Sequence, residues 1–527
     1  MTVRSFAALV ALAASASVAQ AEYTLHILHV NDLHSRIEPI NRFDSTCNAE
    51  DDAAGECFGG VARLATKVAE LRDALIADGQ NVILLDAGDQ FQGSLMYTTY
   101  KGEVEAEFMQ AIGFDVMAVG NHEFDDGPEG LAGFLDSVSF PVISGNIDVS
   151  GSNVLAGRVG RHAVVEVGGA RIGIVSALAV DTVETSSPGE QVVFTDEATS
   201  LAEDVATLEA GGIDKIIALT HVGLRTDLEL AAEVQGLDAI VGGHSHTLMS
   251  NTVEDALPYP QMVGAVPVVQ AFAYSKYLGH LVLEFDDMGN VTSASGDTIL
   301  LDASVTPDAE IAARVAELAG PIEEVKTRLV AQAADDIDGS RDACRIMECT
   351  MGNLVADAML ERVRGQGVSI AIQNGGGLRA SIAAGDVTMG DVLSVLPFQN
   401  TLATFEATGA TVLAALENGV SQFDEGAGRF PQVAGMRYAF DPAADTGSRV
   451  ISAEVDEGGA WVPLDPAKTY GVVTNNYMRG GGDGYAMFDT DGMNAYDFGP
   501  DLADVLADYM AGNAPYQPYT DGRIRMK

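Results

Sequence analysis

The chain has 527 residues, which is longer than one hydrophobic core usually supports, so we expect at least two domains. Apolar residues make up 47% of it, as in ordinary globular proteins, and this excludes an intrinsically disordered chain. The 76 acidic residues outnumber the 29 basic ones and give a formal net charge of −47, which repels nucleic acid and anionic membranes. An anionic substrate therefore needs cations held locally at its binding site.

The N-terminus has the pattern of a secretory signal. Residues 1–21 carry one arginine, an alanine-rich apolar stretch and a small-residue end at Ala19-Gln20-Ala21, which favours cleavage over the alternative of a membrane anchor. No later stretch is long and apolar enough to span a bilayer, and the polar C-terminus lacks a lipid-anchor signal. The sequence predicts an exported protein without a membrane anchor, in the periplasm or the medium, and leaves the oligomeric state open.

Four cysteines form two locally spaced pairs, Cys47 with Cys57 and Cys344 with Cys349. Local pairing is the simplest of the three connectivities that four cysteines allow. A four-cysteine zinc site is the alternative, but neither pair has the usual short C-x-x-C spacing. We expect two local disulfides, formed in an oxidising compartment.

Short apolar segments alternate with amphipathic ones through the first half of the chain. The segments with strand character are 23–31, 81–88, 115–121, 141–147, 171–178, 215–221 and 238–244. Between them, residues 59–79 and 103–113 carry apolar side chains at helical spacing. This alternation predicts βαβ units and hence a layered α/β fold.

From about Thr306 the pattern becomes helical, over residues 307–333, with an interruption only near Gly320-Pro321. Such a segment is typical of a connector between domains, and a second α/β stretch with glycine-rich loops follows from about Ile337. The expected organisation is a signal at 1–21, a first domain at 22–305, a connecting helix and hinge at 306–336, and a second domain at 337–527.

Side chains that can bind metals follow the predicted strands at the points where the strands end. Five of the nine histidines lie in the motifs VNDLHSR, GNHEFD, ALTHVG and GGHSH, at His34, His122, His221, His244 and His246. Two carboxylates occupy matching positions, Asp32 in the first motif and Asp89 in LLDAGDQ. One such motif would be typical of a capped turn, but all of them together indicate a ligand site at the carboxyl edge of the sheet.

Seven groups are candidate metal ligands: Asp32, His34, Asp89, Asn121, His221, His244 and His246. They are too many for one four-coordinate ion, whereas two divalent ions that share Asp89 each have four protein ligands. Mixed imidazole and carboxylate ligands suit Zn²⁺, Mn²⁺ or iron. Two such ions outweigh the charge of the two carboxylates, so they attract a phosphate and yield hydroxide from bound water near neutral pH.

Asn121 and His122 are adjacent at a strand end, so their side chains point in different directions and should not bind the same ion. Asn121 is the natural neutral ligand. His122 is then free to act beside the phosphate, where Asp125 fixes its tautomer and a charged imidazole stabilises the pentacovalent state or protonates the leaving alkoxide. The alternative is that Asp125 caps a turn and His122 is one more metal ligand.

The motifs of the first half together resemble the calcineurin-like metallophosphatases. In the second half, CRIMECTMGNLVADAM, NGGGLR, LPFQN and YMRGGGDG resemble the 5'-nucleotidase family, which includes animal ecto-5'-nucleotidases and periplasmic UDP-sugar hydrolases. The similarity runs from Tyr23 to the end, and the two cysteine pairs look closest to the ecto-5'-nucleotidase branch. It implies an N-terminal four-layer αββα domain and a C-terminal α/β nucleotide-binding domain, with a hinge rotation that closes the active site between them.

The resemblance also implies a role for each matching position. One metal ion is held by Asp32, His34, Asp89 and His246, and the other by Asp89, Asn121, His221 and His244. His122 and Asp125 match the catalytic pair. The substrate-binding positions are Arg345 and Arg379 for phosphate, Asn374, Phe398 and Tyr477 for the base, and Asp483 for ribose. Arg36 is a further candidate for phosphate, and Tyr477 stands where the family often has phenylalanine.

The leading hypothesis is an exported, metal-dependent phosphoric monoester hydrolase that converts nucleoside 5'-monophosphates to nucleoside and phosphate. The nearest alternative within the family is a hydrolase of UDP-sugars, dinucleotides or 2',3'-cyclic nucleotides. A two-lobed exported nucleotide-binding protein without catalysis is a third hypothesis, but capture needs neither seven metal ligands nor His122. A related metallohydrolase acting on a sulfur ester is a fourth, but it does not need residues that sandwich a base.

Overall fold

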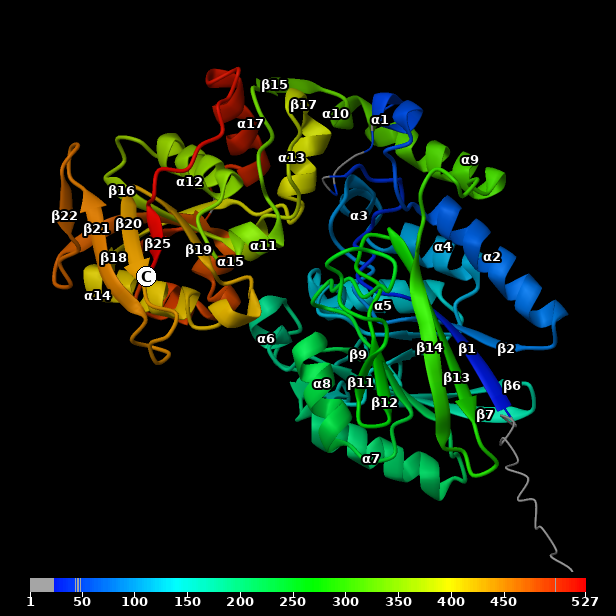
Figure 1. The fold of residues 1–527 in the computed structure, drawn as a ribbon. Helices are drawn as coiled ribbons and strands as arrows, with labels where there is room; N and C mark the ends of the chain where they lie inside the picture. The colour runs from blue at the N-terminus through cyan, green and yellow to red at the C-terminus, as the bar shows by residue number, and fades with distance from the viewer. Residues whose placement is uncertain (1–22, 43, 45–46, 48, 498) are drawn as a thin grey trace, which may run out of the picture.

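The computed structural model describes residues 23–42, 44, 47, 49–497 and 499–527, and the predicted signal at 1–21 lies outside them. These residues form two lobes (Figure 1). The first lobe runs from the N-terminal strand to helix α10 (Glu323–Lys326), and the second from strand β15 (Leu329–Ala333) to the C-terminus. Across the described residues, no helix has the length and apolar character needed to cross a membrane.

The first lobe contains two six-stranded sheets stacked face to face. The first has the order β14-β13-β1-β2-β3-β4. Its strands are β1 (Tyr23–Val30), β2 (Asn81–Asp86), β3 (Val116–Ala118), β4 (Val142–Ile143), β13 (Tyr277–Phe285) and β14 (Val291–Leu300). The second has the order β11-β12-β10-β9-β7-β6. Its strands are β6 (His162–Val167), β7 (Ala170–Leu178), β9 (Ile216–His221), β10 (Ala239–Val241), β11 (Gln261–Val263) and β12 (Val266–Val269).

Strand β1 shows why these segments are apolar on both faces. Leu25 and Ile27 belong to the core between the two sheets, whereas Leu28 and Val30 point to the opposite face and join a core under helices. Successive side chains of a strand alternate between faces, so a sheet covered on both sides needs nearly continuous apolar strands. The first sheet is covered by α2 (Val61–Ala77), α4 (Glu103–Ile112), α5 (Gly127–Ser137) and α9 (Ala309–Ala319).

Helices α7 (Glu197–Ala210) and α8 (Leu224–Glu233) cover the outer face of the second sheet through a separate apolar cluster. The first lobe therefore has the four layers αββα, as the sequence analysis expected.

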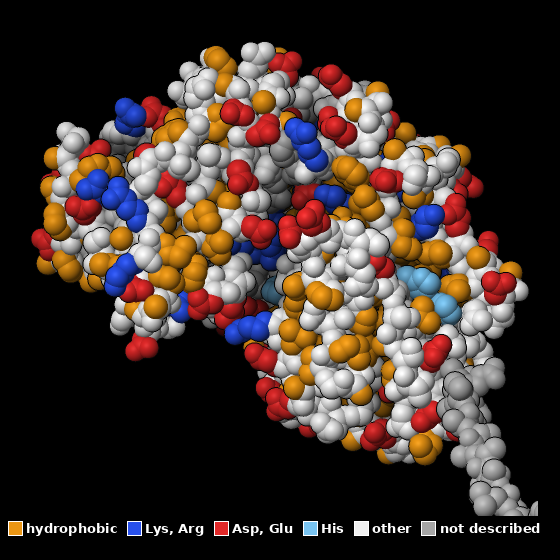
Figure 2. Space-filling model, viewed as in Figure 1, with side chains coloured by type: hydrophobic (Ala, Val, Ile, Leu, Met, Phe, Trp, Pro, Cys, Tyr) orange, Lys and Arg blue, Asp and Glu red, His pale blue; other side chains and the backbone are white. Residues whose placement is uncertain are grey.

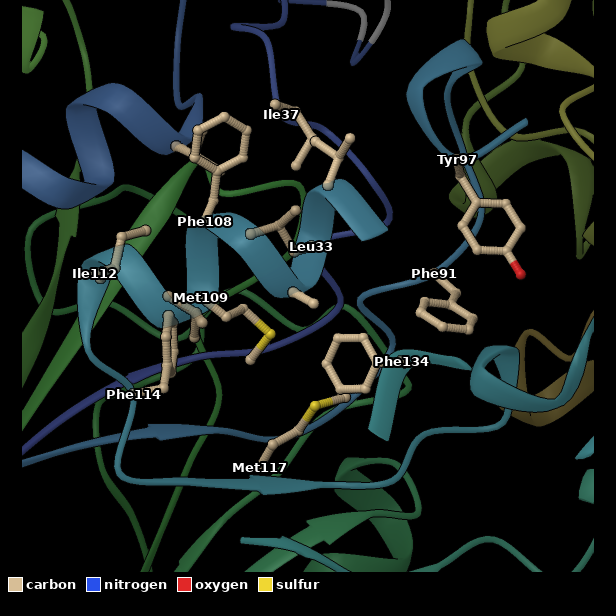
Figure 3. Close-up of a cluster of buried hydrophobic side chains, with 14 of the residues drawn as sticks. Leu33, Ile37, Phe91, Tyr97, Phe108, Met109, Ile112, Phe114, Met117 and Phe134 are labelled. Carbon is tan, nitrogen blue, oxygen red and sulfur yellow. The ribbon is translucent and has the colours of Figure 1, made fainter. Parts of the chain in front are cut away.

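An aromatic cluster supports the loop that follows β2. The Phe91 ring lies 4.8 Å from Tyr97 and 5.6 Å from Phe134 between ring centroids, and Figure 3 shows it with Leu33 in one buried group. Gly102 has φ +89°, and a Cβ there would meet the Phe91 ring at 2.6 Å, so only glycine allows this packing. This core fixes Phe91, two residues after Asp89.

The connecting segment differs from its predicted form. Helix α9 packs on α2, a 3-10 turn follows at Gly320–Ile322, and α10 ends at Lys326. The expected helix beyond that residue is wrong, because Leu329–Ala333 form strand β15, paired antiparallel with β17 (Gly385–Thr388). A short apolar run is compatible with either a helix or a strand, and here pairing with a strand of the second lobe makes it a strand. The chain therefore passes between lobes at residues 327–328.

The second lobe is a mixed α/β domain. Its larger sheet has the order β19-β16-β23-β18-β24 and its smaller sheet the order β22-β21-β20-β25. The larger sheet comprises β16 (Val368–Asn374), β18 (Leu402–Thr408), β19 (Pro431–Ala434), β23 (Thr469–Asn475) and β24 (Met493–Tyr496). The smaller one comprises β20 (Met436–Phe440), β21 (Val450–Asp456), β22 (Trp461–Pro463) and β25 (Ile524–Met526).

Helices pack on both faces of the larger sheet. One side carries α12 (Thr350–Arg362), α13 (Met389–Val395) and α17 (Leu502–Gly512). The other carries α14 (Gly409–Gly419) and α16 (Ala486–Thr490). Both expected disulfides are present, Cys47–Cys57 in the first lobe and Cys344–Cys349 in the second.

Candidate active site

The carboxyl ends of parallel strands from both sheets of the first lobe meet at one edge. Strands β1, β2 and β3 run parallel to one another in one sheet, and β9 and β10 do so in the other. The residues that follow these ends, or end the strand itself, are the seven candidate ligands: Asp32, His34, Asp89, Asn121, His221, His244 and His246. The structure thus brings together all seven groups, and all but the half-buried His244 are buried.

The seven groups form two overlapping sets. In one, His246 Nε2 lies 3.1 Å from Asp32 Oδ1 and 3.0 Å from His34 Nε2. In the other, His221 Nε2 lies 3.1 Å from Asp89 Oδ2. Asn121 Oδ1 lies 2.8 Å from His244 Nδ1 in this second set. The sets meet at Asp89, whose Oδ2 is 3.7 Å from His34 Nε2. Groups of three side chains at both places are close enough to share one ion.

The donor atoms are oriented as metal ligands require. His34 Nδ1–H donates to the Phe91 carbonyl at 3.0 Å, which leaves the Nε2 lone pair facing the two carboxylates. Burial lowers the pKa of His34, His244 and His246 well below the usual value, so these imidazoles are neutral, the form that binds metal.

His221 carries the charge of this cluster when no cation is bound. Burial opposes its protonation, but Asp89 and Asp32 outweigh burial and raise its pKa to about 10. A proton there balances the buried carboxylates, and a divalent cation in the same place serves the same purpose with more charge. The donor set therefore fits divalent metal ions.

The backbone around the ligands is held in unusual conformations. Asp32, Asp89 and His244 have φ values of 52°, 60° and 73°, in the left-handed region that non-glycine residues rarely adopt. The loops that follow β2 and β3 pass close to each other at Gly88 and Gly120. A Cβ at Gly88 would lie 2.6 Å from the Gly120 backbone nitrogen, so this close approach requires glycine. Strained backbone conformations persist only where the surrounding contacts enforce them, and several of them lie at this cluster.

Glu123 is a buried residue that organises the backbone around the cluster and was not predicted from the sequence. Its carboxylate accepts the backbone N–H groups of Gly120 at 2.6 Å, Asp89 at 3.0 Å, Gln90 at 2.8 Å and Phe91 at 3.2 Å. Burial and the charge of Asp89 raise the pKa of Glu123 to about 7. Its only signal in the sequence is an acidic residue between His122 and Phe124 in GNHEFD.

The His122–Asp125 pair forms at the 3-10 turn His122–Phe124. His122 Nδ1 lies 2.6 Å from Asp125 Oδ2, so the ring donates to that carboxylate and keeps Nε2 for other partners. Its backbone N–H donates to Asp89 Oδ1 at 2.9 Å. Burial opposes the charged imidazole, but Asp125 and Asp89 outweigh it and raise the pKa of His122 above the usual value.

Arginines from the second lobe reach over the ligand cluster. Arg379 Nη2 donates to His34 Nε2 at 3.0 Å, and Arg341 Nη2 approaches the His244 carbonyl at 3.5 Å. Burial and the neighbouring arginines lower the pKa of Arg345. Such crowding of cations favours an anion among them. Arg341 was not predicted, although its position four residues before Arg345 places both on one face of a helical turn. Among the described residues lining the cleft, Arg36 is absent, and it packs on the Tyr274 ring instead.

The nucleoside candidates lie together in the second lobe. Asn374 Nδ2 donates to Asp483 Oδ2 at 2.6 Å, and the Tyr477 hydroxyl donates to Asp483 Oδ1 at 3.1 Å. The Phe398 ring stacks on His122 with centroids 5.7 Å apart and 24° between planes. The four side chains therefore lie on the second-lobe side of the site, with Phe398 in contact with the first lobe.

Both lobes line one cleft of about 910 Å³, whose walls include the candidate ligands Asp89, Asn121, His244 and His246, the His122–Asp125 pair, the three arginines and the four nucleoside candidates. Figure 2 shows basic side chains gathered in the hollow between the lobes and acidic ones around its rim. The cleft is lined by carboxylates as well as arginines, but it brings Arg341, Arg345 and Arg379 together on a protein whose net charge is −47. It is therefore suited to an anion with an attached planar group.

Comparisons with known proteins agree with this geometry. The calcineurin-like phosphoesterase family matches residues 25–248, and the 5'-nucleotidase C-terminal domain matches residues 328–490. The 5'-nucleotidase of Bos taurus is 37% identical over 95% of this chain and 91% of its own length, and that of Homo sapiens is 38% identical over 98% and 93%. The crystal structure of a 5'-nucleotidase precursor from Thermus thermophilus has 40% identity and a TM-score of 0.90, covering 96% of this chain and 99% of that one. The chain belongs to the 5'-nucleotidase family, with an N-terminal calcineurin-like metallophosphatase domain and a C-terminal 5'-nucleotidase domain.

Proposed function

We propose that this protein hydrolyses nucleoside 5'-monophosphates to nucleoside and phosphate in the cleft between its lobes. The observation that carries the proposal is the junction of the two lobes, where a buried His/Asp cluster, three arginines and a group of polar and aromatic side chains line one cavity. The curated relatives named 5'-nucleotidase, which match over nearly the full chain, support the same interpretation.

Two divalent ions fit the ligand sets described above. Asp32, His34, Asp89 and His246 are the proposed ligands of one ion, and Asp89, Asn121, His221 and His244 those of the other. When bound, ions such as Zn²⁺ or Mn²⁺ supply Lewis-acid charge that acidifies water and attracts the phosphate. The protein contributes buried, neutral imidazoles whose orientation is fixed by carbonyl acceptors such as that of Phe91.

His122 is the proposed proton donor to the leaving 5'-oxygen. Its Nδ1 is engaged by Asp125, and Asp125 and Asp89 raise its pKa, which favours the charged imidazole whose Nε2 can release a proton into the cleft. The stacking contact with Phe398 places this ring beside the nucleoside pocket.

The second lobe provides the proposed binding groups for substrate. Arg345 and Arg379, joined by Arg341, offer guanidinium groups suited to bidentate contact with phosphate oxygens. Phe398 and Tyr477 are the proposed faces for the base, Asn374 its polar contact, and Asp483 the acceptor for ribose hydroxyls. Aromatic faces bind any base, so this pocket selects a nucleoside rather than one particular base.

The proposal also covers the position of the hinge and the export of the protein. We place the hinge at residues 327–328, within the expected connector 306–336, whose helices pack on the first lobe and whose strand β15 pairs with the second. Export after removal of residues 1–21, to the periplasm or the medium, is supported by two disulfides and by relatives that include venom enzymes of Gloydius brevicauda and Naja atra.

Phosphate release from AMP tests the function. The purified protein should lose this activity in EDTA and regain it with Mn²⁺ or Zn²⁺, and His122→Ala should remain slow in either metal. UDP-glucose, assayed with the same metal, separates a monoesterase from a diesterase or pyrophosphatase. Bound AMP without phosphate release in any metal would overturn the proposal in favour of nucleotide capture.

A further inference from the structure

A serine outside the predicted site completes a hydrogen-bonded chain with the catalytic pair. Ser186 directly follows helix α6 (Thr182–Thr185), and its Oγ–H donates to Asp125 Oδ1 at 2.7 Å. The other oxygen of the same carboxylate, Oδ2, accepts His122 Nδ1–H at 2.6 Å. The three side chains thus form a continuous chain from α6 to the imidazole.

These two hydrogen bonds fix the orientation of the Asp125 carboxylate. A carboxylate that binds through one oxygen can rotate about its Cβ–Cγ bond, whereas one held through both oxygens by donors from separate segments cannot. The side chains of His122 and Asp125 are each only 12% exposed, and Ser186 supplies a fixed donor to the carboxylate oxygen that the imidazole does not use. The direction of the His122 ring therefore depends on Ser186 as well as on Asp125.

The position of Ser186 is set where the lobes meet. Helix α6 packs against the turn η5 (Gly482–Gly484) of the second lobe, the turn that carries Asp483. Figure 1 shows α6 projecting from the first lobe toward the second. Ser186 and its neighbour Thr185 also line the cleft beside Asp125. The position of Ser186 is therefore coupled to the position of the turn that carries Asp483.

We propose that Ser186 is a positioning residue for His122, acting through Asp125, in the hydrolysis of nucleoside monophosphates. This inference rests on the proposed function, because it assigns Ser186 a part in the proton donation given there to His122. It adds a residue that no strand-end motif contains, since SSPG lies in a loop between β7 and β8 (Val193–Phe194).

Steady-state kinetics on AMP with a fixed metal test the proposal. Ser186→Ala should lower kcat about tenfold, the cost of one hydrogen bond to a charged group, and leave KM within about twofold. Ser186→Thr keeps the hydroxyl and should restore most of the lost rate. Ser304→Ala is the matched control, because Ser304 donates to Asp302 at 2.6 Å outside the cleft, and its removal should leave kcat unchanged.

A double-mutant cycle separates positioning from a general structural role. Adding Ser186→Ala to His122→Ala should leave the residual rate unchanged if the serine acts only through the imidazole. A second readout needs no turnover: in metal-free protein with isotope-labelled histidine, the downfield Nδ1–H resonance of His122 should move in Ser186→Ala and stay in Ser304→Ala.

The outcomes are distinct from those that test the function. Wild-type protein that releases no phosphate from AMP overturns the proposed function, and this inference with it. Active wild-type protein with an unchanged kcat in Ser186→Ala overturns the inference alone. Equal losses from Ser186→Ala in the presence and absence of His122 overturn it as well, because the serine would then act on the fold rather than on the ring.

Discussion

The two walls of the cleft are built in different ways. The first-lobe wall is a set of strand ends, held in register by two sheets, with candidate ligands such as Asp32 and Asp89 in left-handed conformations. The second-lobe wall comes from loops and short helical turns, and its arginines touch the first lobe through single contacts such as Arg379 to His34. One wall is fixed within a lobe, and the other depends on how two lobes meet.

This difference assigns different chemistry to the walls. A cluster of buried donors within one lobe can bind ions before any substrate arrives, because its geometry needs nothing from the other lobe. The proposed binding groups on the second lobe reach the first lobe only across the cleft, so they suit recognition and gating if the lobes move. Variants on the first wall should therefore lose metal, and variants on the second should keep metal and lose substrate.

The largest effect is expected for Asp89→Asn. The carboxylate belongs to both ligand sets, so its replacement should remove ions from both and lower kcat/KM for AMP by at least about 10³-fold. Metal content after reconstitution with Zn²⁺ and dialysis is the direct measurement. Asp73→Asn, on the exposed side of α2, is the control for loss of one negative charge. Full metal content in Asp89→Asn would contradict the shared-ligand assignment.

Arg379→Ala should give the opposite pattern. Loss of this proposed phosphate-binding guanidinium should raise KM for AMP by about 10²-fold, while the protein retains the metal content of the wild type. Arg379→Lys should recover only part of the affinity, because an ammonium group cannot make a bidentate contact. Metal loss in either variant would show that the two walls are not independent.

Asp125→Asn should change the pH dependence of kcat. Asp125 helps to raise the pKa of His122, and an imidazole with a raised pKa stays charged up to higher pH and loses its proton as pH rises through that value. Removing the carboxylate charge lowers this pKa, so the alkaline limb of the profile should move to lower pH and the rate at neutral pH should fall about tenfold. An unshifted alkaline limb would assign that limb to another group.

Sequence patterns could predict the first wall better than the second. The seven ligand candidates follow apolar strands, and parallel strand ends necessarily meet at one edge, so their convergence follows from the pattern. Glu123 could not be singled out, because its role lies in four backbone N–H groups that only the folded loops bring together. Ser186 could not be found for the same reason, since 61 residues separate it from Asp125.

The failure at the connector has a similar cause. Residues 307–333 carry apolar side chains that suit a helix, and the helical assignment holds for Ala309–Ala319 and for Glu323–Lys326. Beyond that point, pairing with β17 supplies backbone partners that override local preference and make Leu329–Ala333 a strand. Local pattern cannot reveal a partner that lies more than fifty residues further along the chain.

An effect of similar size to that of Asp125→Asn is expected for Asp483→Asn, which tests whether the second wall recognises the nucleoside. The carboxylate accepts from Asn374 and Tyr477 and is the proposed acceptor for ribose hydroxyls, so its neutral isostere should raise KM for AMP about tenfold. Hydrolysis of p-nitrophenyl phosphate, which has no ribose, should change by less than about twofold in the same variant. Asp491→Asn, an exposed aspartate nearby in sequence, is the control. Equal losses on both substrates would mean that Asp483 supports the fold of η5 rather than ribose recognition, because only a contact with the sugar can depend on whether the sugar is present.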